Sequence, residues 1–245
     1  MRANGFTLLE VLGGLAVIGL IAAVAAIGIR SLVSNSAAQA DALLCRTIAT
    51  DINSLLSQPG FDGFIPITAT AGSVPVSGTN LSSMSPTLIQ SATCFENVLI
   101  AYGVIATPYK FAYLGPRGFE PVPLRYAPTL HAFYTQGDVA PQPGSMTSTP
   151  RVLTVLASPG TAPSAARGSN FWLTPGQDQP AGALIFFVYY PQLDAGQAHA
   201  LAAKLSAPSA VLPAAGQKLD DGPVAYAAAD PTTNKTDVFV FIFTR

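Results

Sequence analysis

The hydrophobic pattern of the chain begins with an apolar stretch from Phe6 to Ile29, in which Glu10 is the one charged residue. As a helix, these 24 residues would be roughly 36 Å long. That length is enough to cross the hydrocarbon core of a bilayer with some tilt. The pattern therefore predicts that residues 6–29 form a single transmembrane helix, preceded by a short polar leader of residues 1–5.

The next stretch, residues 30–57, repeats apolar positions at helical spacing. They are Leu32, Val33, Ala37, Ala40, Leu43, Leu44, Ile48, Ile52, Leu55 and Leu56. Polar side chains, including Asp41, Arg46 and Asp51, fall on the other faces. The sequence Gln58-Pro59-Gly60 is a strong stop signal. We therefore expect one helix from Phe6 to about Ser57, whose amphipathic second half packs on a globular head.

The rest of the chain, residues 60–245, predicts a head domain of short strands. The whole sequence holds 21 glycines and 21 prolines, which favours strands and turns over long helices. Runs rich in β-branched and aromatic residues predict strands at 97–106, 110–114, 122–126, 130–134, 151–157, 183–190, 224–228 and 237–243. Residues 64–76 and 140–150 predict loops, and residues 193–205 predict a helix. The expected fold class is α+β, with the long helix laid on an antiparallel sheet.

Glu10 is the informative exception in the apolar stretch. A carboxylate at the centre of a membrane helix costs about 2.5–3.5 kcal/mol, and somewhat less near the helix start. A cation at the same depth would offset this cost. If the chain were cut between Gly5 and Phe6, the new α-ammonium of Phe6 would be such a cation, and it could meet Glu10 of a neighbouring chain.

The hexapeptide Gly-Phe-Thr-Leu-Leu-Glu at residues 5–10 resembles the N-terminus of type IV pilins and of type II secretion pseudopilins. The resemblance covers about the first 25 residues. It implies that a prepilin peptidase cuts after Gly5 and methylates Phe6, and that Glu10 serves filament assembly. It also implies a pilin-like fold and an inner-membrane assembly platform as a partner.

The same resemblance implies the location of the protein. Arg2 on the short N-terminal side fits a cytoplasmic N-terminus. The protein would be held in the inner membrane before assembly, and in a periplasmic or cell-surface filament with other pilins afterwards. Cell adhesion and protein secretion are the processes that such filaments serve.

Charge is sparse along the whole sequence. The chain has 12 basic and 13 acidic residues and a net charge of −1. Cations are scattered, so a broad nucleic-acid surface is unsupported. A surface with little charge suits a domain that packs against copies or relatives of itself.

Two cysteines, Cys45 and Cys94, are present in a chain expected to lie in an oxidising space. An even count there favours a disulfide over two buried thiols. A Cys45–Cys94 bridge would tie the amphipathic half of the long helix to the head, and closing a loop of about 50 residues would stabilise the fold by a few kcal/mol.

Motifs of catalysis and metal binding are missing from the sequence. His131 and His199 stand alone, and no zinc, nucleophile-elbow or phosphate-loop pattern occurs. Oxygen ligands for calcium cluster near the C-terminus, at Asp220, Asp221, Asp230, Asn234 and Asp237. Their spacing favours a solvated acidic loop. We therefore expect no cofactor, no metal and no enzymatic activity.

The function predicted from these features is a structural subunit of a type IV pilus-like filament, assembled through its N-terminal helix. A pseudopilin of a type II secretion system shares the same motif and is the alternative within the family. A membrane-anchored envelope enzyme or binding domain is the alternative from another class.

Overall fold

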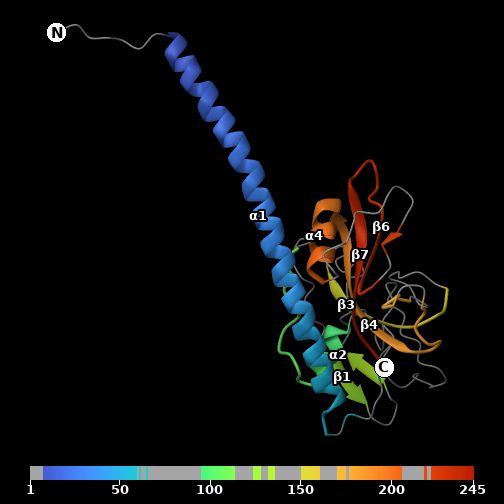
Figure 1. Cartoon of the computed structure of the whole chain (residues 1–245). Helices are drawn as coiled ribbons and strands as arrows, with labels where there is room; N and C mark the ends of the chain where they lie inside the picture. The colour runs from blue at the N-terminus through green and yellow to red at the C-terminus, as the bar shows by residue number, and fades with distance from the viewer. Residues whose placement is uncertain are drawn as a thin grey trace.

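The computed structural model describes residues 8–59, 61, 65, 95–113, 124–127, 132–135, 150–160, 170–174, 177–205, 218–219 and 222–245. Their arrangement is a long helix whose second half lies along a head built on an antiparallel sheet (Figure 1).

Helix α1 (Leu8–Leu56) is continuous over 49 residues, as the sequence predicts. The chain has no proline before Pro59, so no residue removes a backbone donor inside the helix. The last turn ends with bonds from the amide N–H of Ser57 to the carbonyl of Asn53 and from Gln58 to Leu55, directly before Pro59. Figure 1 shows the first half of α1 projecting away from the head.

The main sheet has five strands in the order β3-β4-β7-β6-β5, and every neighbouring pair is antiparallel. The strands are β3 (Arg151–Leu156), β4 (Leu184–Asp194), β5 (Lys218–Leu219), β6 (Val224–Ala227) and β7 (Lys235–Thr244). A separate antiparallel pair is formed by β1 (Leu124–Ala127) and β2 (Ala132–Thr135). The predicted α+β class is confirmed.

Strand β4 is buried on both faces, which is why its sequence is almost uninterruptedly apolar. On one face Phe186, Val188 and Tyr190 join the core cluster that also contains the buried residues of α1, α2 (Glu96–Ala101) and α4 (Ala195–Leu205). On the other face Phe187 belongs to a second cluster, into which Phe171 inserts. The head therefore has a helical layer on one side of the sheet and loop residues on the other.

Most predicted strands are confirmed, but two predictions are wrong. Residues 97–106 were predicted as a strand and instead form α2 and the turn after it. Phe95, Val98, Leu99 and Tyr102 follow helical spacing, and the first three are fully buried, so the helical period outweighs the β propensity of the run. Residues 110–113 of the predicted strand 110–114 hold no strand.

The helix predicted at 193–205 begins two residues later, at Ala195. Leu193 and Asp194 still pair with Thr236 and Lys235 of β7, so the sheet keeps them in strand conformation. The predicted loops 64–76 and 140–150 lie almost wholly outside the described residues.

Candidate functional site

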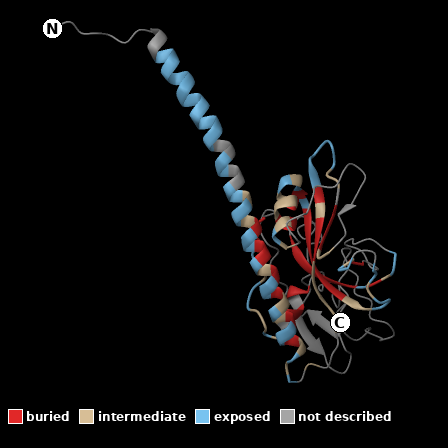
Figure 2. Ribbon diagram, in the orientation of Figure 1, coloured by how far each residue is buried: buried red, intermediate tan, exposed pale blue. Residues whose placement is uncertain are grey.

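The first half of α1 carries the candidate assembly residues. Gly5 and Phe6 lie outside the described residues, and Glu10 lies in α1, although its side chain is not described. The apolar side chains that follow are at least half exposed: Val11, Leu12, Leu15, Val17, Ile18, Leu20, Ile21, Val24 and Ile29. Figure 2 shows this half of the helix as an exposed rod beyond the head. Within the described residues, no helix meets the length and apolarity needed to cross a membrane.

Exposed apolar side chains continue on α1 where the head begins. Leu32, Val33 and Leu43 are 71%, 60% and 64% exposed. On the same half of the helix, three exposed hydroxyl groups are bonded within the helix: Ser36 donates to the carbonyl of Val33, Thr47 to Leu43, and Thr50 to Arg46. Because these donors are already satisfied, the exposed hydroxyls can enter an apolar contact without leaving an unpaired donor.

The buried face of α1 is fixed to the head by polar contacts as well as apolar ones. The Asp41 carboxylate is 1% exposed and accepts hydrogen bonds from two backbone amides, the N–H of Ala112 at 2.6 Å and the N–H of Tyr113 at 3.2 Å. The Tyr113 hydroxyl donates to the carbonyl of Ser34 at 2.8 Å. The sequence pattern puts Asp41 outside the apolar face of the helix; in the structure this carboxylate is buried and accepts hydrogen bonds from the backbone of a distant segment.

The segment Tyr109–Tyr113, which we call the tyrosine segment, is attached to α1 at its other end too. The Tyr109 hydroxyl donates to Oδ2 of Asp51 at 2.7 Å. Between the two ends, Phe111 is buried and meets the ring of Tyr190 edge-on at 5.4 Å. Lys110 and Ala112 are exposed. Alternate side chains of the tyrosine segment thus anchor it along the second half of α1.

Burial shifts the pKa values of Asp41 and Tyr190, which lie where α1 contacts the tyrosine segment and β4. Desolvation raises the pKa of Asp41 above its ordinary 3.8, although the hydrogen bonds from Ala112, Tyr113 and Tyr190 act in the opposite direction. Burial, with the nearby Cys45 and Asp41, raises the pKa of the Tyr190 hydroxyl well above its ordinary value. Tyr190 therefore stays protonated at any physiological pH and remains a hydrogen-bond donor.

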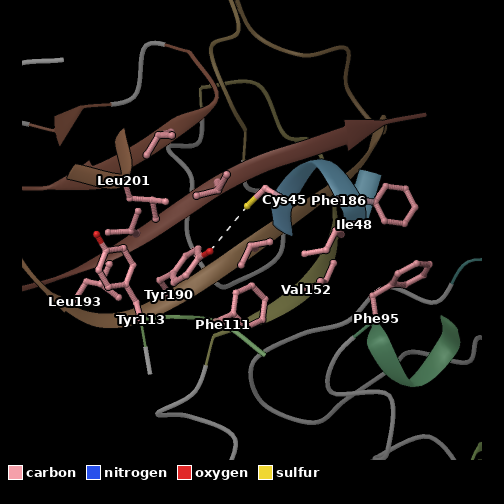
Figure 3. Packing of buried hydrophobic residues seen from close by; sticks show 14 of the residues in the cluster. Cys45, Ile48, Phe95, Phe111, Tyr113, Val152, Phe186, Tyr190, Leu193 and Leu201 are labelled. Atoms are coloured by element: carbon pink, nitrogen blue, oxygen red, sulfur yellow. Dashed lines mark hydrogen bonds between the residues drawn. The ribbon is translucent and has the colours of Figure 1, made fainter. Parts of the chain in front are cut away.

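Cys45 lies on the same buried face as a free thiol. Its Sγ is 3.9 Å from the hydroxyl oxygen of Tyr190 (Figure 3). Burial raises the pKa of the Cys45 thiol to about 12, so almost no reactive thiolate exists at neutral pH. Cys94 lies outside the described residues. The bridge to Cys94 is thus not formed at Cys45 in this structure, and it stays a prediction for protein from an oxidising space.

The C-terminal acids that the sequence offered as calcium ligands have structural partners where they are described. Asp230 accepts from the amides of Thr232 and Thr233 in the turn between β6 and β7. Asp237 accepts from the Tyr189 hydroxyl and from the amide of Gln192. Asp220 and Asp221 lie outside the described residues. Among the residues that the structure describes, no group of three or more His, Cys, Asp or Glu could hold a metal ion.

The two histidines are not brought together with other chemistry in the described part of the chain. His199 is half-buried on α4, and His131 lies outside the described residues. The arrangement around α1 can hold the second half of this helix on the sheet and leave its first half exposed. The sequence analysis missed the set of contacts between α1 and the tyrosine segment. The alternation of Tyr109, Phe111 and Tyr113 was the available signal, but it was interpreted as a strand.

Comparison with known proteins bears on the N-terminus alone. Residues 1–26 match the family model of the prokaryotic N-terminal methylation motif. No curated protein and no solved structure is significantly similar to the chain. The match begins before the described helix and ends within its exposed apolar half. The first 26 residues of this chain therefore carry the prokaryotic N-terminal methylation motif, the prepilin-type signal of type IV pilins and pseudopilins.

Proposed function

We propose that the protein is a non-enzymatic structural subunit of a type IV pilus-like filament. The methylation motif over residues 1–26 supports this proposal, because Gly5-Phe6 and Glu10 fall inside it. A prepilin peptidase cleaves after Gly5 and methylates the new N-terminal Phe6. The mature chain starts with the apolar helix and retains the whole head.

The observation that carries the proposal is that the motif leads into one continuous helix whose first half projects away from the head (Figure 1). Apolar side chains from Val11 to Val33 that are half or more exposed need a partner other than water. Before assembly this partner is the inner membrane, with residues 6–29 embedded and the head on the far side. In the filament the partner is the same part of neighbouring helices, where small residues such as Gly19 and Ala23 permit close approach.

Glu10 brings each subunit into register with the next. In an apolar bundle its carboxylate needs a cation, and cleavage creates one at Phe6 of the neighbouring subunit. The low dielectric around such a pair strengthens the attraction. The cleavage that creates the Phe6 amine and the apolar helix that carries Glu10 thus both serve filament assembly.

A pseudopilin of a type II secretion system has the same N-terminal requirements, so the motif supports it equally. The two differ in location: a pilus extends from the cell surface, whereas a pseudopilus stays in the periplasm. Abundance in filaments sheared from the cell surface favours the pilus, and retention in the periplasm with a secretion defect on deletion favours the pseudopilus. A membrane-anchored enzyme or binding domain would appear in neither fraction.

The experiment that tests the proposal is a mass measurement of the N-terminus. Gly5→Glu places a bulky charge at the cleavage position, where the peptidase accommodates a small residue, so the leader stays attached. Ala3→Glu is the matched control, since it adds the same charge two residues away, and cleavage proceeds. A mature N-terminus at Phe6 in the Gly5→Glu protein would refute processing at this site.

A further inference from the structure

A surface segment of the head, described at residues 170–174 and 177–179, surrounds the partly exposed Trp172. We call it the Trp172 loop, and it contains the one tryptophan of the sequence. Phe171 is fully buried in the second core cluster and anchors the loop to the sheet. A bridge between Thr174 and Gln177 closes its outer part. Trp172 is partly exposed, and the neighbouring Leu173 is 39% exposed.

Asp178 fixes the tryptophan ring in place. Its Oδ1 accepts from Nε1 of Trp172 at 2.7 Å and from Nδ2 of Asn170 at 2.8 Å, and its Oδ2 accepts from the amide N–H of Gly160 at 2.9 Å. Asn170 is itself 1% exposed, and its Oδ1 accepts from the amides of Phe171 and Gln179. A ring held this way is ordered before any ligand arrives, so binding to it loses little conformational entropy.

The carboxylate retains capacity for a ligand. A carboxylate can accept about four hydrogen bonds, two on each oxygen. The described residues use two on Oδ1 and one on Oδ2, and Asp178 is exposed. One acceptor position with negative charge thus faces solvent beside a partly exposed, immobilised indole.

The size and charge of the surface formed by Trp172, Leu173 and Asp178 indicate which kind of ligand it binds. A stable protein–protein contact covers about 800 Å² on each side, far more than one indole and one leucine provide. The carboxylate opposes phosphates and other anions. A pyranose fits both features, because its face of C–H groups stacks on the electron-rich face of an indole and its hydroxyls donate to a carboxylate.

We propose that the Trp172 loop binds a neutral saccharide, with a pyranose ring stacked on Trp172 and a hydroxyl donating to Asp178. This goes beyond the filament role and does not depend on it. Anionic sugars are rejected by the charge of Asp178, and the head gains a ligand contact on a part of the molecule separate from α1.

The direct test uses the intrinsic emission of the single tryptophan in the full chain, dissolved in lauryldimethylamine oxide because sugar-based detergents would compete. The probes are N,N′-diacetylchitobiose, cellobiose and lactose, with 3′-sialyllactose as the anionic counterpart of lactose. We expect a saturable change in emission for at least one neutral probe at on the order of 1 mM, and none for 3′-sialyllactose. No change with any neutral probe at high millimolar concentration would overturn the proposal.

Variants locate the binding, measured by saturation-transfer NMR on the sugar protons so that the tryptophan is not needed for detection. Trp172→Ala is expected to weaken binding about tenfold or more, and Trp172→Phe less, because it keeps a smaller aromatic face. Asp178→Asn weakens binding, whereas Asp230→Asn, a matched exposed turn carboxylate, leaves it unchanged. Thermal unfolding checks that each variant is folded. Undiminished binding in folded Trp172→Ala or Asp178→Asn would overturn the assignment.

Discussion

The two halves of helix α1 differ in what they touch although one uninterrupted helix contains both. From Val11 to Val33 the large apolar side chains that the structure describes are half or more exposed. From Ala38 onward one face is buried, with Ile48, Ile52 and Leu55 at 0% exposure. The helical backbone is the same, so the difference lies in the side chains and in the head that covers them. A single helix can thus be part of the core with one half and leave the other half exposed.

The largest effect is expected from the buried face of the second half. Ile48→Ala removes fully buried methyl groups and is expected to lower the free energy of unfolding of the head by about 2–5 kcal/mol. Leu43→Ala changes an exposed residue five positions away in the same helix and should stay within about 0.5 kcal/mol. Denaturant unfolding followed by tryptophan emission measures both. Equal losses of unfolding free energy in the two variants would contradict the packing of one face of α1 against the head and the exposure of the other.

A smaller effect is expected from the polar contacts between α1 and the tyrosine segment. Asp41→Ala leaves the amides of Ala112 and Tyr113 without their acceptor, and is expected to cost about 1–3 kcal/mol. Asp51→Ala removes a contact to the Tyr109 hydroxyl at a half-buried position and should cost less. Hydrogen exchange provides the local readout, since the Ala112 and Tyr113 amides should lose protection in Asp41→Ala and keep it in Asp51→Ala. Retained protection in Asp41→Ala would contradict the bonds that we assign to Asp41.

The smallest effect is a pH dependence. The pKa of Asp41 in the folded protein is raised above 3.8 by burial, so the native state binds this proton more readily than the unfolded chain does. The contribution of Asp41 to stability is then greatest at low pH and declines as pH rises from about 4 through the folded pKa. We expect the free energy of unfolding of the wild type, minus that of Asp41→Asn, to fall over that range. A difference that rises with pH would mean that the hydrogen bonds outweigh desolvation at Asp41.

The sequence predicted the long helix, its stop at Pro59 and the central apolar strand, because each rests on a strong local pattern. Residues 184–190 are apolar on both faces, and the structure buries them on both. The polar contacts between α1 and the tyrosine segment could not be predicted from the sequence. Asp41 accepts hydrogen bonds from residues 71 and 72 positions away, and a single carboxylate in an amphipathic helix gives no sign of such distant donors. Helix α2 was missed because its β-prone residues also satisfy a helical period.

The central claim is that the first half of α1 exists for assembly and not for the fold, and Glu10 tests it most directly. Glu10 lies roughly 57 Å along the helix from Ile48 at about 1.5 Å per residue, so replacing it cannot disturb the core of the head. The measurement is the ratio of filament-borne to membrane-borne protein for the wild type, Glu10→Asp and Glu10→Val, in cells where this is the only pilin expressed. The account predicts cleavage and head stability unchanged in all three, with the ratio reduced in Glu10→Asp and strongly reduced in Glu10→Val. A wild-type ratio in Glu10→Val would contradict it.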